Sequence, residues 1–459
     1  MTKRHLSGLF LLLALALSAA MFQGPTKIAP TVAPAGDPFS IVDAAAKRLV
    51  DGSVAIFRLA GIVKILPLET HHPYSTARGR LAADMVGGEY TVSVRLPNGT
   101  EIALGSFTVL GPPSPSWPSL YVLASSDGFA GPHRIAEGTI NADGTVSFPA
   151  TLRDTNGLSN LNSSDSGLAV SSDRAWLFVG HNESNLVEAF ARQPDGSLIS
   201  TSTIPIQTAG SIIAHPTLPM IYVADLTRPT PSFIKALSYT PGGILAVSQT
   251  VATPDELRGI ALTADGAFLI TTHIGFFSAA NRVEVYAVDA AGHVSATPVD
   301  TEFPLDAGRI ADVVVDAATG GVYIKDLDRG IYGYHLDGSG ALTPMNGGVP
   351  FPVSGNFLHD VKAANGRLVA LSGFGSVFID VFEIQPAGLA LASTLAVHDG
   401  QQRLAVTADG TTVFASSRLF DGYIRSYAVS PTLAIAEVPG SPAVVPVAGL
   451  NLGGLAATK

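Results

Sequence analysis

The sequence predicts an all-β protein, and three observations support this prediction. Only 14% of the 459 residues are charged, whereas 47 are glycine and 31 are proline, so turn formers are abundant between short apolar runs. From Ser119 onward, a pattern of four apolar runs recurs seven times. The last residues, GLNLGGLAATK, resemble the first run of that pattern, which the first copy, SLYVLASSD, lacks. These features predict a seven-bladed β-propeller that its C-terminal strand closes.

The N-terminal segment is typical of a secretory signal. Two basic residues precede an apolar stretch from Leu9 to Leu17, and small residues follow up to Ala20. We therefore predict a signal peptide over residues 1–20, export to a bacterial periplasm or the exterior, and no membrane span after cleavage. An uncleaved anchor is the alternative, although the stretch is short for a membrane span. Cysteine is absent, which excludes disulfides, thiolate metal ligands and cysteine nucleophiles.

Two folded regions are expected after this segment, because a chain with 47% hydrophobic residues can bury more than one core. Residues 21–37 are rich in proline and alanine and predict a linker. Residues 111–118, GPPSPSWP, predict a stiff connector, because their four prolines cannot join a central sheet. Residues 38–110 then form a small domain, and residues 119–459 form the propeller.

The second half of the small domain has clear strand signals. Tyr90, Val92 and Val94 alternate with polar neighbours, Asn98–Gly99 supplies a hairpin turn, and Phe107 continues the pattern in a final strand. This segment resembles the end of an IPT/TIG immunoglobulin-like domain over roughly thirty residues, which implies a small β-sandwich-like domain.

The first half of the small domain has a different pattern. Ile41, Ala45 and Leu49 have the spacing of one helix face. Ser40 is a suitable N-cap residue just before them. The sequence therefore predicts a short helix that begins near Ser40, where the immunoglobulin-like pattern would have strands.

The fourth copy of the repeat shows how one blade is built. Ile260–Thr263 predicts the inner strand, Phe268–Thr271 the second and Val283–Val288 the third, and the outer strand is expected to start at Val294. A tight turn before the outer strand recurs in every copy, and these seven turns set the number of blades: Asp143–Gly144, Asp195–Gly196, Gly242–Gly243, Ala291–Gly292, Ser339–Gly340, Ala387–Gly388 and a turn near Pro431.

Several of these units resemble a known family. AHPTLPMIYVAD from Ala214, RGIALTADGAFLITT from Arg258 and RLAVTADGTTVFASSR from Arg403 are similar to units of the YVTN-repeat and lactonase-like propellers, which include the propeller type of 6-phosphogluconolactonase. The resemblance covers residues 119–459. It implies a ligand site at the mouth of the axial channel and lactone hydrolysis as a possible activity, but the units themselves specify blade packing and hardly any chemistry.

Ligands of propellers usually bind where two sets of loops surround the channel. The loops that enter the inner strands carry Arg258, Arg309, His359 and Arg403 in four successive blades, at what the spacing suggests are equivalent positions. Their convergence would suit a carboxylate or phosphate, because arginine binds such groups through two hydrogen bonds. The alternative is that each arginine pairs with a carboxylate of the adjacent blade and ties the blades together.

The loops between second and third strands carry four further candidates for ligand binding: His181, Asn182, His273 and Arg418. Lactonase-like propellers tend to place Asn-Glu and Asn-Arg pairs here. Asn182 is followed by a glutamate, as in the first of these pairs, whereas a serine precedes Arg418 and departs from the second.

The catalytic candidates are His359 and Glu183. If a lactone binds, an arginine can polarise its carbonyl as negative charge develops, while one of these two residues accepts a proton from water. A sequence cannot show whether such groups converge. The competing hypothesis is therefore a non-catalytic periplasmic or surface protein that uses its propeller and its small domain for interaction with a protein partner.

Other functions are not expected. A net charge of −10 and the lack of a lysine or arginine cluster after the N-terminus argue against a nucleic-acid partner. There is no GxSxG motif, no glycine-rich phosphate loop and no HExxH spacing, so neither a cofactor nor a metal is predicted. We expect a monomer whose partner is a small molecule or another protein.

Overall fold

The structure is a computed structural model that forms two compact units, one up to Pro112 and one from Pro113 onward. The hairpin turn Thr240–Ile244 joins two strands of the second unit and is described with it. The structure describes residues 27–29, 32–34, 38–42, 49, 53–59, 62–71, 76–80, 88–110, 119–125, 133–149, 152–157, 167–193, 197–226, 231–253, 255–274, 281–304, 306–373, 376–397, 400–417, 422–445 and 451–457. The predicted signal peptide and the connector 111–118 lie outside these residues.

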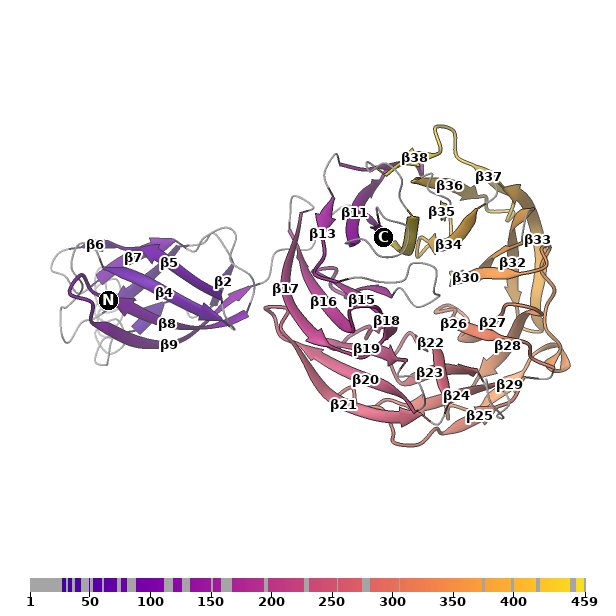
Figure 1. The fold of residues 1–459 in the computed structure, drawn as a ribbon, viewed down its shortest axis with the longest axis horizontal. Coiled ribbons are helices and arrows are strands. Elements are labelled where there is room, and N and C mark those ends of the chain that lie inside the picture. Colours follow the sequence, from indigo (N-terminus) through magenta and orange to yellow (C-terminus); the bar gives the residue numbers. More distant parts are fainter. Residues whose placement is uncertain are drawn as a thin grey trace, which may run out of the picture. The chain divides into compact units, whose positions relative to one another are not determined.

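The first unit consists of two β-sheets (Figure 1). One sheet has the strand order β1 (Lys27–Ala29), β3 (Pro38–Val42), β7 (Thr76–Arg80), β6 (Glu69–His71). The other has the order β2 (Val32–Pro34), β9 (Glu101–Leu110), β8 (Gly88–Arg95), β4 (Val54–Leu59), β5 (Ile62–Pro67), in which β2 and β9 run parallel. Both sheets contribute to one core.

The core of the first unit follows from the alternation in its strands. Tyr90 and Phe107 are buried and meet Phe57 edge to face, with ring centroids 6.1 and 5.5 Å away. The predicted turn at Asn98–Gly99 is present, because Leu96 N donates to Thr100 O at 2.8 Å and Gly99 has a φ of +85°.

The helix predicted from Ser40 is wrong where the structure describes this segment. Ser40 and Ile41 lie in β3, which pairs with β1 and β7. Residues 43–48 lie outside the described part of the chain, and Leu49 is buried in the core. Ile41 is also buried there. Sheet pairing on both sides of β3 decides the conformation against the local helical spacing.

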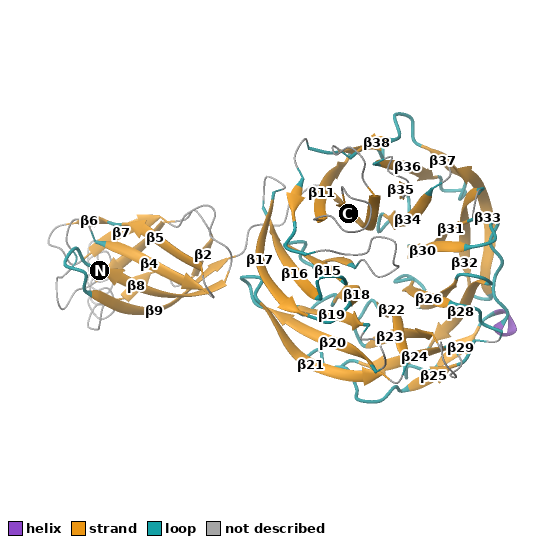
Figure 2. Ribbon diagram, in the orientation of Figure 1, coloured by secondary structure: helices purple, strands orange, loops and turns teal. Residues whose placement is uncertain are grey.

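The second unit consists of seven antiparallel sheets among the described residues, and they stand around a common centre (Figures 1 and 2). We number the sheets in chain order, and each runs outward from the strand nearest the centre. Their strands are β39 (Asn451–Ala457), β10 (Ser119–Ser125), β11 (His133–Ile140) and β12 (Val146–Ser147), with β13 (Arg153–Asp154) beside β11; β14 (Leu168–Val170), β15 (Trp176–His181), β16 (Leu186–Arg192) and β17 (Leu198–Pro205); β18 (Ala209–Ala214), β19 (Met220–Asp225), β20 (Ser232–Tyr239) and β21 (Leu245–Thr253); β22 (Glu256–Leu262), β23 (Phe268–Ile274), β24 (Arg282–Ala287) and β25 (Asp300–Glu302); β26 (Ile310–Val315), β27 (Gly321–Asp326), β28 (Gly330–Leu336) and β29 (Leu342–Pro344); β30 (Leu358–Ala364), β31 (Arg367–Ser372), β32 (Val377–Gln385) and β33 (Gly388–Val397); and β34 (Gln401–Val406), β35 (Thr412–Ser417), β36 (Tyr423–Val429) and β37 (Ile435–Glu437), with β38 (Ala443–Val444) beside β36.

The C-terminal strand completes the first sheet. β39 pairs antiparallel with β10, with Leu120 opposite Ala457 and Val122 opposite Leu455. Leu452 is only 2% exposed and packs in one cluster with Leu120 and Val122. The expected pairing between the two ends of this unit is therefore confirmed.

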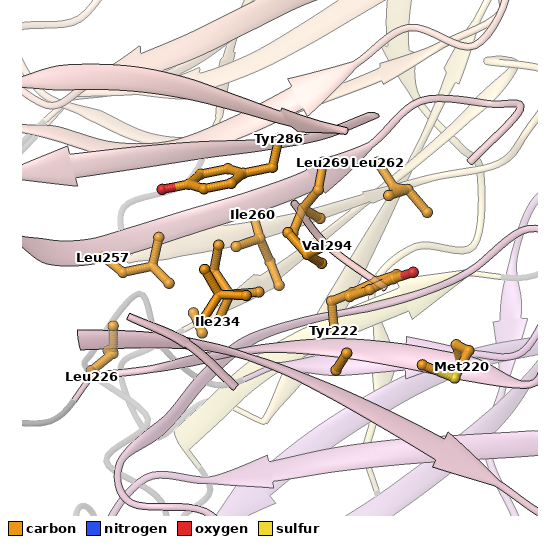
Figure 3. Packing of buried hydrophobic residues seen from close by; sticks show 13 residues of the cluster. Met220, Tyr222, Leu226, Ile234, Leu257, Ile260, Leu262, Leu269, Tyr286 and Val294 are labelled. Atoms are coloured by element: carbon orange, nitrogen blue, oxygen red, sulfur yellow. The ribbon is translucent and has the colours of Figure 1, made fainter. Parts of the chain in front are cut away.

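Apolar side chains fill the space between neighbouring sheets. Figure 3 shows the cluster between the third and fourth sheets, where Tyr222 and Ile234 lie close to Ile260 and Leu269. Each such cluster excludes water from two sheets at once. In the fourth sheet the outer strand is β25, Asp300–Glu302, whereas Val294 makes only an isolated bridge and does not begin that strand as expected.

Candidate functional site

A cavity of about 250 Å³ lies at the centre of the second unit. Residues of the innermost strands of all seven sheets line it. In the second sheet Gly167, the residue just before the innermost strand, lines it as well. Its charged lining residues are Asp312, Asp360, Lys362 and Arg403. The remaining lining residues are small or apolar: Gly167, Leu168, Ser211, Ile212, Ile213, Ile260, Val313, Val314, Leu404 and Leu455.

A repeated β-bulge aims three of these charged side chains. In β22, β26, β30 and β34 the register with the second strand of the sheet shifts by one residue at the same place. One residue of each innermost strand has no partner there, and the next residue resumes the pairing. Such a bulge changes the direction of the following side chain. The resuming residues are Gly259, Asp312, Asp360 and Arg403, and the last three line the cavity.

The bulges correct one premise of the sequence analysis. Arg258 and His359 are the extra residues of their bulges, Arg309 precedes β26, and Arg403 resumes the pairing in β34. The four residues therefore do not occupy equivalent positions, and of these four only Arg403 lines the cavity. Sequence spacing could not show this, because a bulge adds a residue without changing the repeat length.

The other two arginines of this set lie beside carboxylates. Arg258 Nη2 is 2.7 Å from Glu256 Oε1. Arg309 binds Asp328 through two hydrogen bonds of 2.9 and 2.7 Å, and this pairing lowers the pKa of Asp328. Each pair lies within one sheet and its adjoining loops, so these two arginines are paired with carboxylates, but the pairs do not tie neighbouring sheets together as the alternative predicted.

His359 is held by the loop that follows the second strand of its sheet. Its Nε2 lies 2.6 Å from the carbonyl oxygen of Gly373, so Nε2 carries the proton in this hydrogen bond. The ring also packs against Phe357, with centroids 5.0 Å apart. Burial lowers the pKa of His359, and the hydrogen bond to Gly373 opposes this only in part. His359 is therefore neutral at pH 7, with Nδ1 as its proton acceptor.

Asp360 organises the charges at the cavity. Its Oδ1 lies 2.8 Å from Lys362 Nζ, and its Oδ2 accepts a 2.8 Å hydrogen bond from Leu404 N in the next sheet. Burial alone would raise the pKa of Asp360, but Lys362, Lys325 and Arg403 outweigh burial and lower it. The carboxylate is therefore ionised at neutral pH and joins the sixth and seventh sheets.

Lys325 is a member of this cluster that the sequence analysis missed. It lies in β27 opposite Asp312, is 1% exposed, and donates a 3.1 Å hydrogen bond from Nζ to His359 O. Burial lowers its pKa, and Asp312 and Asp360 counteract this effect. A lysine at the end of the otherwise apolar run GVYIK was the available signal. With Lys325, the cluster contains three cationic side chains, the other two being Lys362 and Arg403, and the two carboxylates of Asp312 and Asp360. Its net charge is therefore +1 when all five groups are ionised.

The candidates from the second set of loops lie elsewhere. His181 and His273 are fully buried, and their Nε2 atoms lie 3.5 and 3.1 Å from Glu188 and Glu284 of their own sheets. Asn182 and Glu183 belong to the turn between β15 and β16, where Glu183 is exposed. None of these residues lines the cavity.

Arg418, the remaining candidate, lies outside the described residues. Within the residues that the structure describes, no group of three or more histidine, aspartate or glutamate side chains is placed to hold a metal ion. No helix in this part of the chain is long and apolar enough to cross a membrane.

The radial sheets and the polar central cavity define the second unit as a β-propeller. Among solved structures, the chain is similar to the periplasmic gluconolactonase of Pseudomonas aeruginosa, with a TM-score of 0.58 and 17% identity over 75% of this chain and 99% of that one. It is also similar to a putative 6-phosphogluconolactonase of Bacteroides fragilis, with a TM-score of 0.58 and 13% identity over 74% and 98% of the two chains.

A hypothetical selenium-binding protein of Sulfolobus tokodaii is similar to nearly the same degree, with a TM-score of 0.57 and 12% identity over 75% of this chain and 96% of that chain. No protein-family model and no curated sequence matches the chain. At such identities the likeness establishes the β-propeller fold alone, and the site has to supply any argument about function.

Proposed function

We propose that the propeller binds a small anionic, sugar-derived molecule, such as an aldonate or an aldonolactone, in its axial cavity. The observation that carries the proposal is the pair of cations, Arg403 and Lys362, on the cavity wall. An arginine beside a lysine suits a carboxylate or phosphate, since arginine donates two parallel hydrogen bonds and lysine adds a point charge. The net positive charge of the cluster favours an anion further. Two of the similar solved structures, a periplasmic gluconolactonase and a putative 6-phosphogluconolactonase, are named for sugar-derived lactones of this class.

The reaction to test is hydrolysis of a lactone. Water adds to the carbonyl carbon, the ring C–O bond breaks, and a hydroxy acid results. Arg403 would stabilise the negative charge that develops on the carbonyl oxygen. The proton acceptor would be a group outside the cavity lining, because neither sequence candidate lines the cavity. His359, whose Nε2 is occupied by Gly373, would take the water proton on Nδ1 and pass it to the departing alkoxide only for a ligand that reaches past the cavity wall, and the same condition holds for Glu183 on its exposed turn.

We further propose that the seven sheets are the blades of a YVTN-type seven-bladed propeller and that the first unit is an IPT/TIG-like immunoglobulin-like domain. The two-sheet sandwich around Phe57 supports the second assignment. We also propose that the protein is exported, on the basis of its N-terminal sequence. We propose that it functions as a monomer, on the basis of the expected ring closure. An N-terminal sequence of the mature protein from a periplasmic extract tests export, since a start at Met1 would contradict cleavage.

The alternative is a non-catalytic interaction protein, and one observation favours it. Strand β5 is the edge of its sheet, and its Val63 and Ile65 are 53% and 54% exposed. An exposed edge with β-branched residues can pair with a strand of a partner.

Binding and turnover should be measured separately on the full chain. Gluconate and 6-phosphogluconate binding is followed by calorimetry, and gluconolactone hydrolysis above the spontaneous rate is followed by titration of the released acid. We expect Arg403→Gln to weaken binding about 10- to 100-fold, as for hydrogen bonds to a charged group. Arg309→Gln is the matched control, because Arg309 is exposed and outside the cavity. Equal effects of the two substitutions would refute the site. Binding without hydrolysis would support the site and reject the reaction, whereas neither binding nor hydrolysis would favour the interaction protein.

A further inference from the structure

A second pocket, of about 260 Å³, lies between the fifth and sixth sheets. On one side it is lined by residues of the fifth sheet and of the loops next to its strands, among them Gly321 and Tyr323 in β27. On the other side it is lined by the end of β32, through Ile384 and Gln385, and by Pro386 in the turn between β32 and β33. This turn connects third and outer strands, so the pocket is remote from the axial cavity, with which it shares no lining residue.

The corresponding place between the third and fourth sheets is closed. There, Tyr222 occupies the position in β19 that Tyr323 has in β27. Its hydroxyl donates a 2.9 Å hydrogen bond to Gly292 O, in the turn before the outer strand of the fourth sheet. Gly292 also packs against Met220, the first residue of β19. A turn backbone thus covers the tyrosine and satisfies its hydroxyl.

Two changes open the pocket between the fifth and sixth sheets. First, the turn after β32 has two residues between the paired Gln385 and Gly388, whereas the turn in the fourth sheet has three between Asp289 and His293. Second, Gly321 stands where β19 has Met220 and β23 has Phe268. The turn is too short to reach over the tyrosine, and the side chain that would fill the gap is missing.

Tyr323 is left with a buried hydroxyl whose only hydrogen-bonding neighbour among the described residues is the Thr319 side chain, and the geometry of that contact is too poor for a full hydrogen bond. Thr319 lies beside it, but the Thr319 hydroxyl already donates to Asp316 Oδ2 at 2.9 Å and accepts from Gly321 N at 3.2 Å. A Cβ on Gly321 would lie 2.5 Å from the Tyr323 hydroxyl oxygen. An unsatisfied buried donor destabilises the folded state, so an acceptor that enters the pocket and reaches Tyr323 would gain the free energy of one hydrogen bond.

We propose that this pocket binds a small, uncharged and mainly apolar molecule that offers one hydrogen-bond acceptor to Tyr323. The acceptor replaces the turn carbonyl that Tyr222 uses in the third sheet. Met345, Ile384 and Pro386 supply apolar walls, and Thr319, His335 and Gln385 are the polar lining residues besides Tyr323. No aspartate, glutamate, lysine or arginine is among the described residues that line the pocket. Since a dry cavity of about 150 Å³ holds benzene, the larger volume here suits a bicyclic molecule.

Quinoline and naphthalene are a matched pair of probes, because they share a shape and only quinoline carries an acceptor. Their binding to the full chain is measured by saturation-transfer NMR titration at pH 8, where quinoline is uncharged. We expect quinoline to bind about tenfold tighter than naphthalene, which is the contribution of one hydrogen bond. Tyr323→Phe should abolish this preference and leave naphthalene binding unchanged.

Two further variants keep the result interpretable. Tyr222→Phe removes the equivalent hydroxyl of the third sheet and should leave quinoline binding unchanged. Ile384→Trp, at a half-buried position on the rim, should fill the pocket and weaken both probes, while far-UV circular dichroism verifies that the variant is folded. The proposal is overturned if neither probe binds the wild-type protein, if both bind equally well, or if Tyr222→Phe acts like Tyr323→Phe.

Discussion

Acid should destabilise the propeller through one buried histidine, His133. This residue begins β11, is fully buried and stacks on His181, whose ring centroid is 6.1 Å away. Burial, together with the neighbouring His181, lowers the pKa of His133 from 6.5 to about 4. Gly157 packs directly on the ring of His181, because a Cβ at residue 157 would overlap with that ring. The two histidine rings therefore have no room to separate.

The sign and size of the effect follow from this pKa. In the unfolded chain His133 takes up a proton near pH 6.5, but in the folded protein it does so only near pH 4. The unfolded state therefore binds more protons between these values, so stability falls as the pH falls through this window. Since each pKa unit is worth about 1.4 kcal/mol, the full loss is about 3 kcal/mol below pH 4.

The assay is urea unfolding of wild-type protein and His133→Asn at pH 7 and pH 4. Carboxylates and the other histidines also change charge between pH 7 and pH 4, but both proteins contain them. The loss of unfolding free energy between pH 7 and pH 4 should therefore be about 3 kcal/mol larger in the wild type. Equal losses in the two proteins would refute the argument that His133 is held neutral by its surroundings.

Three further predictions concern the closing strand, the cavity charges and the contact between sheets, each measured as a change in unfolding free energy. Leu452→Ala should cost about 2–5 kcal/mol because Leu452 is buried where β39 closes the first sheet, whereas Leu391→Ala, at a 53% exposed position, should cost little. A small effect of Leu452→Ala would mean that β39 does not hold the ring. Asp360→Asn should cost about 3–5 kcal/mol, because it leaves buried Lys325 without one of its two counter-charges. An unchanged urea midpoint of unfolding would show that water already screens the charges of the cluster. Gly259→Ala should cost about 1–3 kcal/mol, because the new Cβ would lie 2.7 Å from a backbone carbon of β26. The same substitution at Gly338, which has open space around it, should be neutral. Similar costs at both positions would contradict the tight contact at Gly259.

The architecture could be predicted because its signals are local and repeated. The turn residues recur in every sheet; at Asp265, for example, one carboxylate oxygen accepts bonds from Thr263 and from Ala267 N, and Gly266 takes the required positive φ. The pairing of the C-terminal strand could be predicted because its sequence repeats that of the innermost strands. In the small domain the same approach failed at Ile41, because pairing with two neighbouring strands outweighs helical spacing.

The site was predicted less well, for a geometric reason. Loop position in the sequence suggested four equivalent cations, but the bulges move the register, so that Arg403 reaches the cavity and Arg258 does not. Lys325 comes from a second strand and enters the cluster from behind the innermost strands, which a search restricted to loops does not cover. Which charges meet depends on register and on neighbouring sheets, and neither is visible in spacing alone.

The pairing of β39 with β10 also determines when the propeller can fold. Among the described strands of the second unit, β10 is synthesised first and β39 last, and at about 5–20 residues per second the intervening chain takes on the order of tens of seconds to synthesise. During that interval one edge of β10 has no partner from its own sheet. The ring therefore closes only after translation has passed Ala457, so the hazard of aggregation is greatest on the ribosome, before the first contact across the seam is made.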